Sequence, residues 1–111
     1  MGSIKKVVIL GTGNVAWHLS FALFKAGLDV VQIYGRNQTS AENYAKRVLA
    51  EPVSDLKTIH QDADLYLLCI NDKSISEIAA RLQHVSGIVA HTSGSVSMNE
   101  LKPHLEIGVF Y

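Results

Sequence analysis

A glycine-rich turn between an apolar run and a helix-like stretch is the feature that most constrains the fold of this chain. The apolar residues of Lys5–Leu10 lead directly into Gly11-x-Gly13-x-x-Ala16. Gly11 permits a tight turn out of a strand, and Gly13 has no Cβ to hold a ligand away from the backbone. Ala16 is small enough for the following helix to lie close to the strand. The spacing therefore predicts a strand–turn–helix unit.

The first turn of a helix offers unpaired N–H groups and the positive end of the helix dipole, which together attract phosphate groups. A glycine turn between a strand and a helix near the N-terminus is typical of the phosphate-binding turn of a dinucleotide-binding βαβ unit. The alternative is a glycine-rich strand–helix turn that binds no ligand.

Apolar strand-like runs alternate with helix-like stretches along the whole chain, a pattern typical of a parallel α/β sheet. We expect strands at 5–10, 30–34, 52–53, 65–70, 87–91 and 108–111. We expect helices at 15–26, 40–49, 75–84 and 98–101, with a turn at 56–60 and with Gly27 ending the first helix in the left-handed conformation. This order predicts an α/β fold of three layers: a doubly wound, mostly parallel sheet of the Rossmann type with strand order 3-2-1-4-5-6 and a ligand crevice at the strand C-termini.

Composition narrows the function classes. The chain has 111 residues, of which 48% are hydrophobic, enough for one domain with its own core. Its formal net charge is zero and it has no basic run, which argues against nucleic acid as a partner. It contains no apolar stretch of membrane-spanning length. Its single cysteine, Cys69, lies in an apolar run and is expected to be a buried small side chain. These features fit a cytoplasmic protein.

The end of the second predicted strand bears on the choice of cofactor. NAD-preferring folds place an acidic residue near here to bind the ribose hydroxyls, whereas this chain has Arg36. A guanidinium pairs with a phosphate that a carboxylate would repel, so Arg36 favours NADP. Asn37, Thr39 and Ser40 are further donors, and Ser40 is the expected N-cap of the next helix. The alternative for Arg36 is a solvated loop side chain.

Two further loops follow predicted strands on the crevice side. Asn71 is expected to contact the cofactor, and Asp72 to cap the following helix. Ser93 is a candidate hydrogen-bonding residue for substrate or cofactor. His91 is a weak catalytic candidate as a general acid, because its pKa lies near neutrality, but it equally fits a strand-end histidine that bonds to the backbone. The other histidines show no metal-ligand spacing, so no metal is expected.

The first predicted helix has more apolar residues than expected for an amphipathic helix with one face exposed to solvent. Its expected sheet-facing stripe comprises Val15, Leu19, Ala22, Leu23 and Ala26. A second row comprises Trp17, Phe21 and Phe24. This row either packs against a neighbouring helix or forms a docking surface for another domain or subunit. With Phe110 and Tyr111 it predicts self-association.

Taken together, Gly11–Ala16, Arg36-Asn37, Asn71-Asp72 and His91-Thr-Ser-Gly-Ser95 resemble a known family. The chain resembles the Rossmann-like domain of bacterial NADP oxidoreductases that carry a C-terminal helical domain of uncharacterised function. That family is similar to the N-terminal domains of pyrroline-5-carboxylate reductase, deazaflavin-dependent NADP reductase and the 6-phosphogluconate dehydrogenase superfamily. The resemblance implies NADP contacts from Gly11, Gly13, Asn14, Val15 and Arg36, and a crevice lined by Asn71 and Ser93. Thr12 and Asn37 are expected as further cofactor contacts.

These inferences predict the NADP-binding domain of an oxidoreductase that transfers hydride between NADP(H) and a small carbonyl or imine compound. Residues 1–111 are expected to be the N-terminal part of a longer two-domain protein, a homodimer at full length and inactive as the isolated domain. The alternatives are a non-catalytic dinucleotide sensor or regulatory domain and, third, an interaction domain with an empty crevice.

Overall fold

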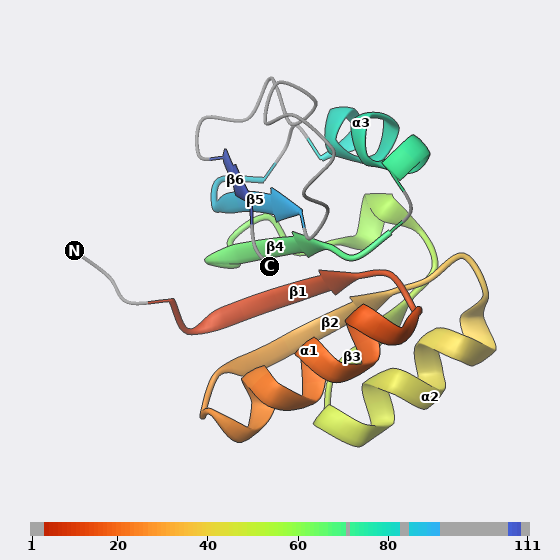
Figure 1. Ribbon diagram of the computed structural model, residues 1–111, viewed down its shortest axis with the longest axis vertical. Coiled ribbons are helices and arrows are strands. Elements are labelled where there is room, and N and C mark those ends of the chain that lie inside the picture. The colour runs from red at the N-terminus through yellow and green to blue at the C-terminus, as the bar shows by residue number, and fades with distance from the viewer. Residues whose placement is uncertain (1–3, 71, 83–84, 92–106, 110–111) are drawn as a thin grey trace.

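A central parallel sheet with helices on both faces forms the framework of the molecule (Figure 1). The computed structural model describes residues 4–70, 72–82, 85–91 and 107–109. In chain order its elements are β1 (Lys6–Leu10), α1 (Asn14–Lys25), β2 (Asp29–Tyr34), α2 (Gln38–Val48), β3 (Glu51–Val53), the 3-10 turn η1 (Leu56–Thr58), β4 (Leu65–Leu68), α3 (Asp72–Arg81), β5 (Ile88–His91) and β6 (Ile107–Val109).

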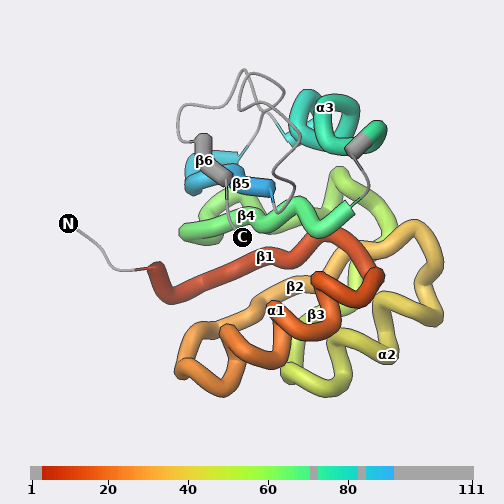
Figure 2. The backbone as a smooth tube through the Cα atoms, in the orientation of Figure 1, coloured from red at the N-terminus to blue at the C-terminus, as the bar shows by residue number. Residues whose placement is uncertain are grey.

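The sheet has six strands in the order β3-β2-β1-β4-β5-β6, and every strand pair is parallel. This confirms the expected α/β class and strand order. Helices α1 and α2 lie on one face of the sheet and α3 lies on the other, as the backbone tube also shows (Figure 2). The helices that follow β1 and β2 therefore cover one face, and the helix that follows β4 covers the other. The strand order reverses between β1 and β4, at the same place in the sheet. A crevice opens at such a switch point in doubly wound sheets.

The strand β1 shows why the strands appear in the sequence as continuous apolar runs. Val7 and Ile9 pack on the face of α1 and α2, while Val8 and Leu10 pack on the face of α3, and all four are 0% exposed. A strand buried on both faces favours apolar side chains at every position, so alternation disappears. The two hydrophobic clusters that β1 separates form the core of the domain.

Helix α1 packs on the sheet with a different face from the predicted one. Ala16 and Ser20 are its buried residues, whereas Val15 is 51% exposed, and Ala22 and Ala26 are also exposed. The predicted stripe was wrong at these three positions because α1 is apolar almost all round, so periodicity alone does not fix its orientation. Ser20 is tolerated in the core because its hydroxyl donates to the Trp17 carbonyl at 3.1 Å.

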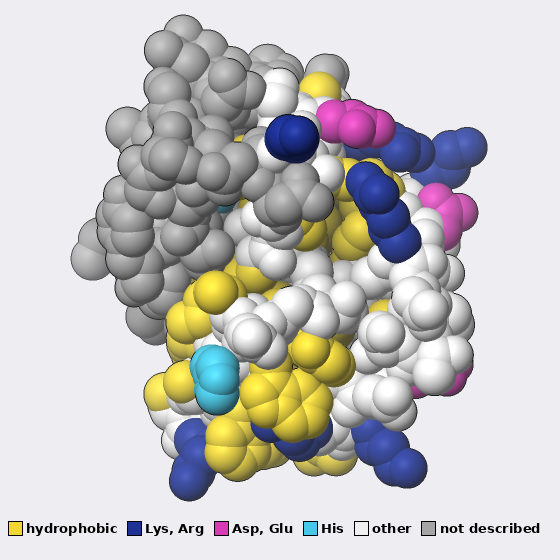
Figure 3. Space-filling model, turned by 45° about the vertical axis from the view of Figure 1, so that its right-hand side comes forward, with side chains coloured by type: hydrophobic (Ala, Val, Ile, Leu, Met, Phe, Trp, Pro, Cys, Tyr) yellow, Lys and Arg dark blue, Asp and Glu magenta, His cyan; other side chains and the backbone are white. Residues whose placement is uncertain are grey.

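The second apolar row of α1 packs against the neighbouring helix. Trp17 and Phe24 are partly buried, and Trp17 contacts Tyr44 and Arg47 of α2. Phe21 remains 38% exposed. Figure 3 shows hydrophobic side chains gathered in the lower part of one face, with Lys and Arg side chains beside them. Self-association through this surface stays a prediction, and Phe110 and Tyr111 lie outside the described residues.

Helix boundaries follow local hydrogen-bonding chemistry. Gly27 has φ +93°, and the N–H groups of Gly27 and Leu28 donate to the carbonyls of Phe24 and Leu23, which confirms the left-handed end of α1. Asn37, rather than Ser40, caps α2: its side-chain oxygen accepts from the Ser40 N–H at 3.1 Å. Helix α3 begins at Asp72 itself, one position earlier than an Asp72 cap would require. The helix expected at 98–101 lies outside the described residues.

Asp64 ties the amino ends of the strands together. Its carboxylate accepts from the backbone N–H groups of Lys6 at 2.9 Å and Lys5 at 3.0 Å. These hydrogen bonds, the one from Lys6 first, hold the pKa of Asp64 below its ordinary value of 3.8. The carboxylate therefore stabilises the fold fully above pH about 4, and this contribution is lost as the pH falls through the folded-state pKa.

We expect Asp64→Asn to unfold at a lower temperature than the wild type at pH 7, because a neutral amide accepts backbone hydrogen bonds less strongly than a carboxylate. The gap between the two proteins should narrow below pH about 4, where the wild-type carboxylate also becomes neutral. Thermal unfolding at pH 7 and at pH 3 measures this. A gap of equal size at both values would contradict the role given to the charge.

Candidate functional site

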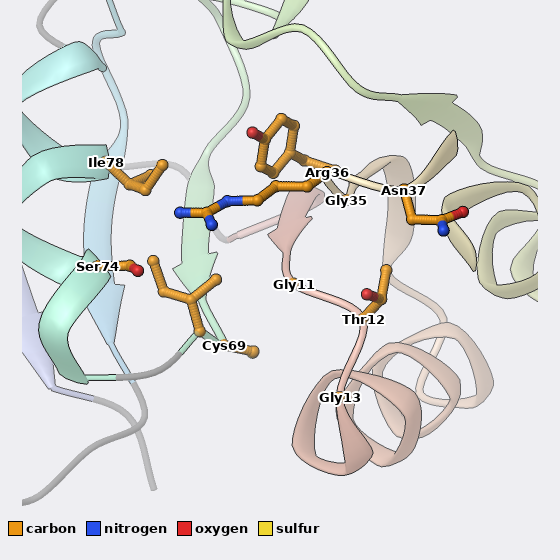
Figure 4. Close-up of a pocket in the computed structure, with 11 residues that line it drawn as sticks. Gly11, Thr12, Gly13, Gly35, Arg36, Asn37, Cys69, Ser74 and Ile78 are labelled. Carbon is orange, nitrogen blue, oxygen red and sulfur yellow. The ribbon is translucent and has the colours of Figure 1, made fainter. Parts of the chain in front are cut away.

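A pocket of about 340 Å³ lies at the switch point of the sheet, where the carboxyl ends of β1, β2 and β4 meet α3 (Figure 4). Its volume is within the range of small-molecule sites. The residues that line it are Gly11, Thr12, Gly13, Tyr34, Gly35, Arg36, Asn37, Cys69, Ile70, Ser74 and Ile78. The glycine turn and the segment after β2, both predicted as site elements, thus meet in one pocket.

The two glycines of the turn, Gly11 and Gly13, have different structural roles. Gly11 has φ +134°, and a Cβ there would lie 2.1 Å from the Cys69 carbonyl oxygen, so only glycine allows β1 and β4 to approach at this point. Gly13 has φ −89°, and a Cβ there would have no atom within 4 Å. Gly11 is therefore required by the protein's own packing. At Gly13 the fold leaves open space beside the pocket.

The pocket is bounded by two helix N-termini. Gly13 is the N-cap of α1, and its carbonyl accepts from the Trp17 N–H at 3.0 Å. Asn37 is the N-cap of α2. Neither helix has an acidic residue in its first turn. Both positive dipole ends are thus open to an anion at the pocket, with no nearby carboxylate in either turn to oppose it.

Arg36 is the charged residue among those that line the pocket. Its exposed side chain extends across the pocket toward α3, which carries Ser74 and Ile78 (Figure 4). The side chain of Asn37 points toward α2, in keeping with its capping bond, and its amide nitrogen is not used by that bond. Thr39 and Ser40, expected as further donors, belong to α2 and do not line the pocket.

The remaining predicted site residues are distributed differently. Asn14 and Val15 begin α1 with exposed side chains that do not line the pocket. His91 ends β5 with 0% exposure and does not line the pocket. Asn71 and Ser93 lie outside the described residues.

The pocket also includes residues that sequence reasoning did not select. Tyr34, Gly35, Cys69 and Ile70 stand at or just after strand ends, a position that could have identified them. Cys69 is buried, as expected, at 8% exposure, and its N–H donates to the Leu10 carbonyl at 2.7 Å. Ser74 and Ile78 come from α3, and no sequence pattern separates Ile78 from the core residues of that helix.

Other site types find no support in the described part of the chain. No three His, Cys, Asp or Glu side chains within it are grouped so that they could hold a metal ion. None of the helices described there has the length and apolar character needed to cross a membrane.

Residues 3–110 match the model of the Rossmann-like domain family. The match takes in nearly the whole chain, and the strand order and the glycine turn agree with it. This chain belongs to the Rossmann-like domain family. A comparison with curated protein sequences gives no match.

Solved structures share this fold. A "putative NADP oxidoreductase" from Bacteroides fragilis is 33% identical, with a TM-score of 0.89 over 97% of this chain and 43% of its own. Prephenate dehydrogenase from A. aeolicus, in complex with hydroxyphenyl propionate and NAD+, is 18% identical, with a TM-score of 0.78 over 96% and 41%. Myo-inositol dehydrogenase from Lactobacillus casei, in complex with NAD(H) and myo-inositol, is 15% identical, with a TM-score of 0.78 over 96% and 36%. This chain thus spans less than half of the length of each of these structures.

Proposed function

We propose that this Rossmann-like domain binds NADP(H) and serves an oxidoreductase that acts on a small carbonyl or imine compound. The observation that carries the proposal is the pocket at the switch point, bounded by the N-termini of α1 and α2 and crossed by Arg36. NADP(H) carries a pyrophosphate and a 2′-phosphate, which supply one anionic group for the N-terminus of each helix. The name of the Bacteroides fragilis protein, at 33% identity, supports the same cofactor.

In this proposal the pyrophosphate binds at the glycine turn. The backbone N–H groups of Asn14 and Val15 stand in the first turn of α1, where N–H groups have no partner within the helix. The open space at Gly13 lets the phosphates approach them. Thr12 lines the pocket beside the turn, and its side chain points toward Gly35 (Figure 4).

The 2′-phosphate binds at the end of β2 in this proposal. Arg36 supplies a guanidinium that pairs with a phosphate in a charge-assisted, bidentate way. The amide nitrogen of Asn37 and the N-terminus of α2 add donors at the same place. Tyr34 and Ile78, which also line the pocket, offer apolar surface for the adenine ring.

The nicotinamide of the bound cofactor would supply the hydride chemistry. Asn71 and Ser93 remain proposed crevice residues, and His91 remains a weak catalytic candidate that its burial does not favour. We further propose that the domain is the N-terminal part of a two-domain, cytoplasmic, homodimeric protein. Its match to only 43% of the Bacteroides fragilis chain supports a second domain.

The protein that contains this domain should oxidise NADPH in the presence of a carbonyl or imine from a substrate panel, followed by the loss of NADPH absorbance. The 111-residue domain alone should bind NADPH without turnover, because catalysis needs substrate held with water excluded. Tight NADPH binding with no turnover in the longer protein would favour a dinucleotide sensor instead. Absence of NADPH binding in both proteins would contradict the proposal.

A further inference from the structure

Helix α2 contacts the phosphate-binding turn directly. The Tyr44 hydroxyl donates to the Gly13 carbonyl oxygen at 3.4 Å, across 31 residues of sequence. The Arg47 guanidinium donates to the Trp17 carbonyl oxygen, one helical turn further along α1. Both acceptors belong to the start of α1, so α2 holds this segment at two successive levels.

The side chains around these bonds form a packed α1–α2 cluster, made of Trp17, Phe21, Tyr44 and Arg47. The rings of Trp17 and Tyr44 meet edge to face, with centroids 4.7 Å apart and planes at 73°. The Arg47 guanidinium carbon lies 3.4 Å from the Trp17 ring centroid and 4.7 Å from that of Phe21. A guanidinium stacked on aromatic rings and bonded to a carbonyl has little freedom, so the cluster is a rigid contact.

Arg47 makes contacts in this cluster that packing between two helices does not by itself require. Arg47 is only partly exposed, and its Nε is buried without a hydrogen-bond acceptor in the described structure. Leaving a buried donor unpaired has a cost, which the stacking and the bond to Trp17 must offset. Methionine or leucine at this position would pack on the same rings without that cost. Compared with these side chains, arginine adds a positive charge stacked on the rings and a hydrogen bond to the Trp17 carbonyl near the start of α1.

We propose that Tyr44 and Arg47 are positioning residues for the dinucleotide. Neither residue lines the pocket itself, and they act by fixing the backbone of Gly13–Trp17 so that its N–H groups already point toward the pyrophosphate. A turn that is ordered before binding loses less entropy when the ligand binds, which raises affinity. This inference rests on the proposed binding of a dinucleotide at Gly13.

The sole tryptophan of the chain, Trp17, makes the test direct. Its backbone N–H donates to the Gly13 carbonyl, so Trp17 lies one helical turn from the glycine turn. A nucleotide bound at that turn should therefore change the fluorescence of its indole ring. We expect Arg47→Met to raise the Kd for NADPH roughly 10-fold, and Tyr44→Phe, whose hydrogen bond is long, about 2- to 5-fold. Because both residues act at the pyrophosphate, which NADPH and NADH share, the ratio of the two affinities should stay unchanged.

Tyr66→Phe is the matched control. Its hydroxyl also bonds to the backbone, donating to the His60 carbonyl and accepting from the Ala63 N–H at 3.1 Å, but none of these residues lines the pocket. This variant should lower the unfolding temperature and leave the Kd for NADPH as in the wild type, measured by calorimetry well below that temperature.

The outcomes separate the two proposals. If the wild type binds neither NADPH nor NADH, the proposed function is wrong and the inference falls with it. If the wild type binds, and Arg47→Met and Tyr44→Phe bind with the wild-type Kd, the inference alone is overturned. A rise in Kd equal to that of Tyr66→Phe would also overturn it, since the effect would then follow from stability. Should Arg47→Met fail to fold, Tyr44→Phe, which keeps the ring against Trp17, decides the question.

Discussion

Gly13→Val should abolish dinucleotide binding while the domain stays folded. The side chain enters open space beside the pocket, where no atom lies within 4 Å of the Cβ position, and it fills the place proposed for the pyrophosphate. Loss of two charge-assisted hydrogen bonds costs about 3 kcal/mol or more, which weakens binding roughly 100-fold or more. An N-cap change from glycine to valine costs about 1 kcal/mol at most, so the unfolding temperature should fall by only a few degrees.

Gly11→Ala provides the contrast within the same turn. Its backbone φ of +134° and the 2.1 Å approach to the Cys69 carbonyl mean that even a methyl group displaces β1 from β4. We expect a loss of about 3 kcal/mol or more in the free energy of unfolding. Circular dichroism and calorimetric titration of both variants separate the two roles. Normal NADPH binding by Gly13→Val would show that the nucleotide does not bind at this turn.

Arg36→Ala should remove the preference for NADPH over NADH. A charge-assisted pair with the 2′-phosphate contributes about 1.5–3 kcal/mol, so the wild type should prefer NADPH by roughly 10- to 150-fold. The variant should lose affinity for NADPH alone, because NADH has no phosphate at this position. Titration of both cofactors against both proteins measures the ratio.

Arg81→Ala is the control for the change in net charge. Arg81 is an exposed residue in the last turn of α3 and does not line this pocket. It should leave the ratio of NADPH to NADH affinity at the wild-type value. Equal affinities for the two cofactors in the wild type, or a ratio unchanged in Arg36→Ala, would contradict the assignment of Arg36 to the 2′-phosphate.

The order of the sheet could be predicted because its central strands have a strong signal. Val7–Leu10 of β1 are buried on both faces, and a continuous apolar run suits that environment. The turn after β1 needs glycine for reasons that local geometry sets, at Gly11 through its positive φ. Both features leave their mark on consecutive residues of the chain, so the sequence alone indicates them.

The orientation of α1 could not be predicted in the same way. Apolar residues occur nearly all round this helix, and the difference between a stripe through Val15 and one through Ala16 is a rotation of a single residue. In the folded chain, Tyr44 and Arg47 of α2 pack on Trp17. Contacts between helices that are distant in sequence leave no local pattern.

The same distinction applies to the site: residues next to a strand end could be predicted from the sequence, and residues brought in by helix packing could not. Arg36 was predictable because it follows directly from the end of a strand, where parallel sheets bind their ligands. Ser74 and Ile78 reach the pocket only because α3 packs across the switch point from the opposite face of the sheet. Tyr44 and Arg47 do not line the pocket, and their hydrogen bonds to Gly13 and Trp17 appear only in the folded chain.

A crystal structure of the domain grown with NADP+ tests the central claim most directly. The account predicts the pyrophosphate within hydrogen-bond distance of the N–H groups that follow Gly13, and the 2′-phosphate paired with the Arg36 guanidinium. A nucleotide bound elsewhere on the molecule, or bound here with its 2′-phosphate away from Arg36, would contradict it.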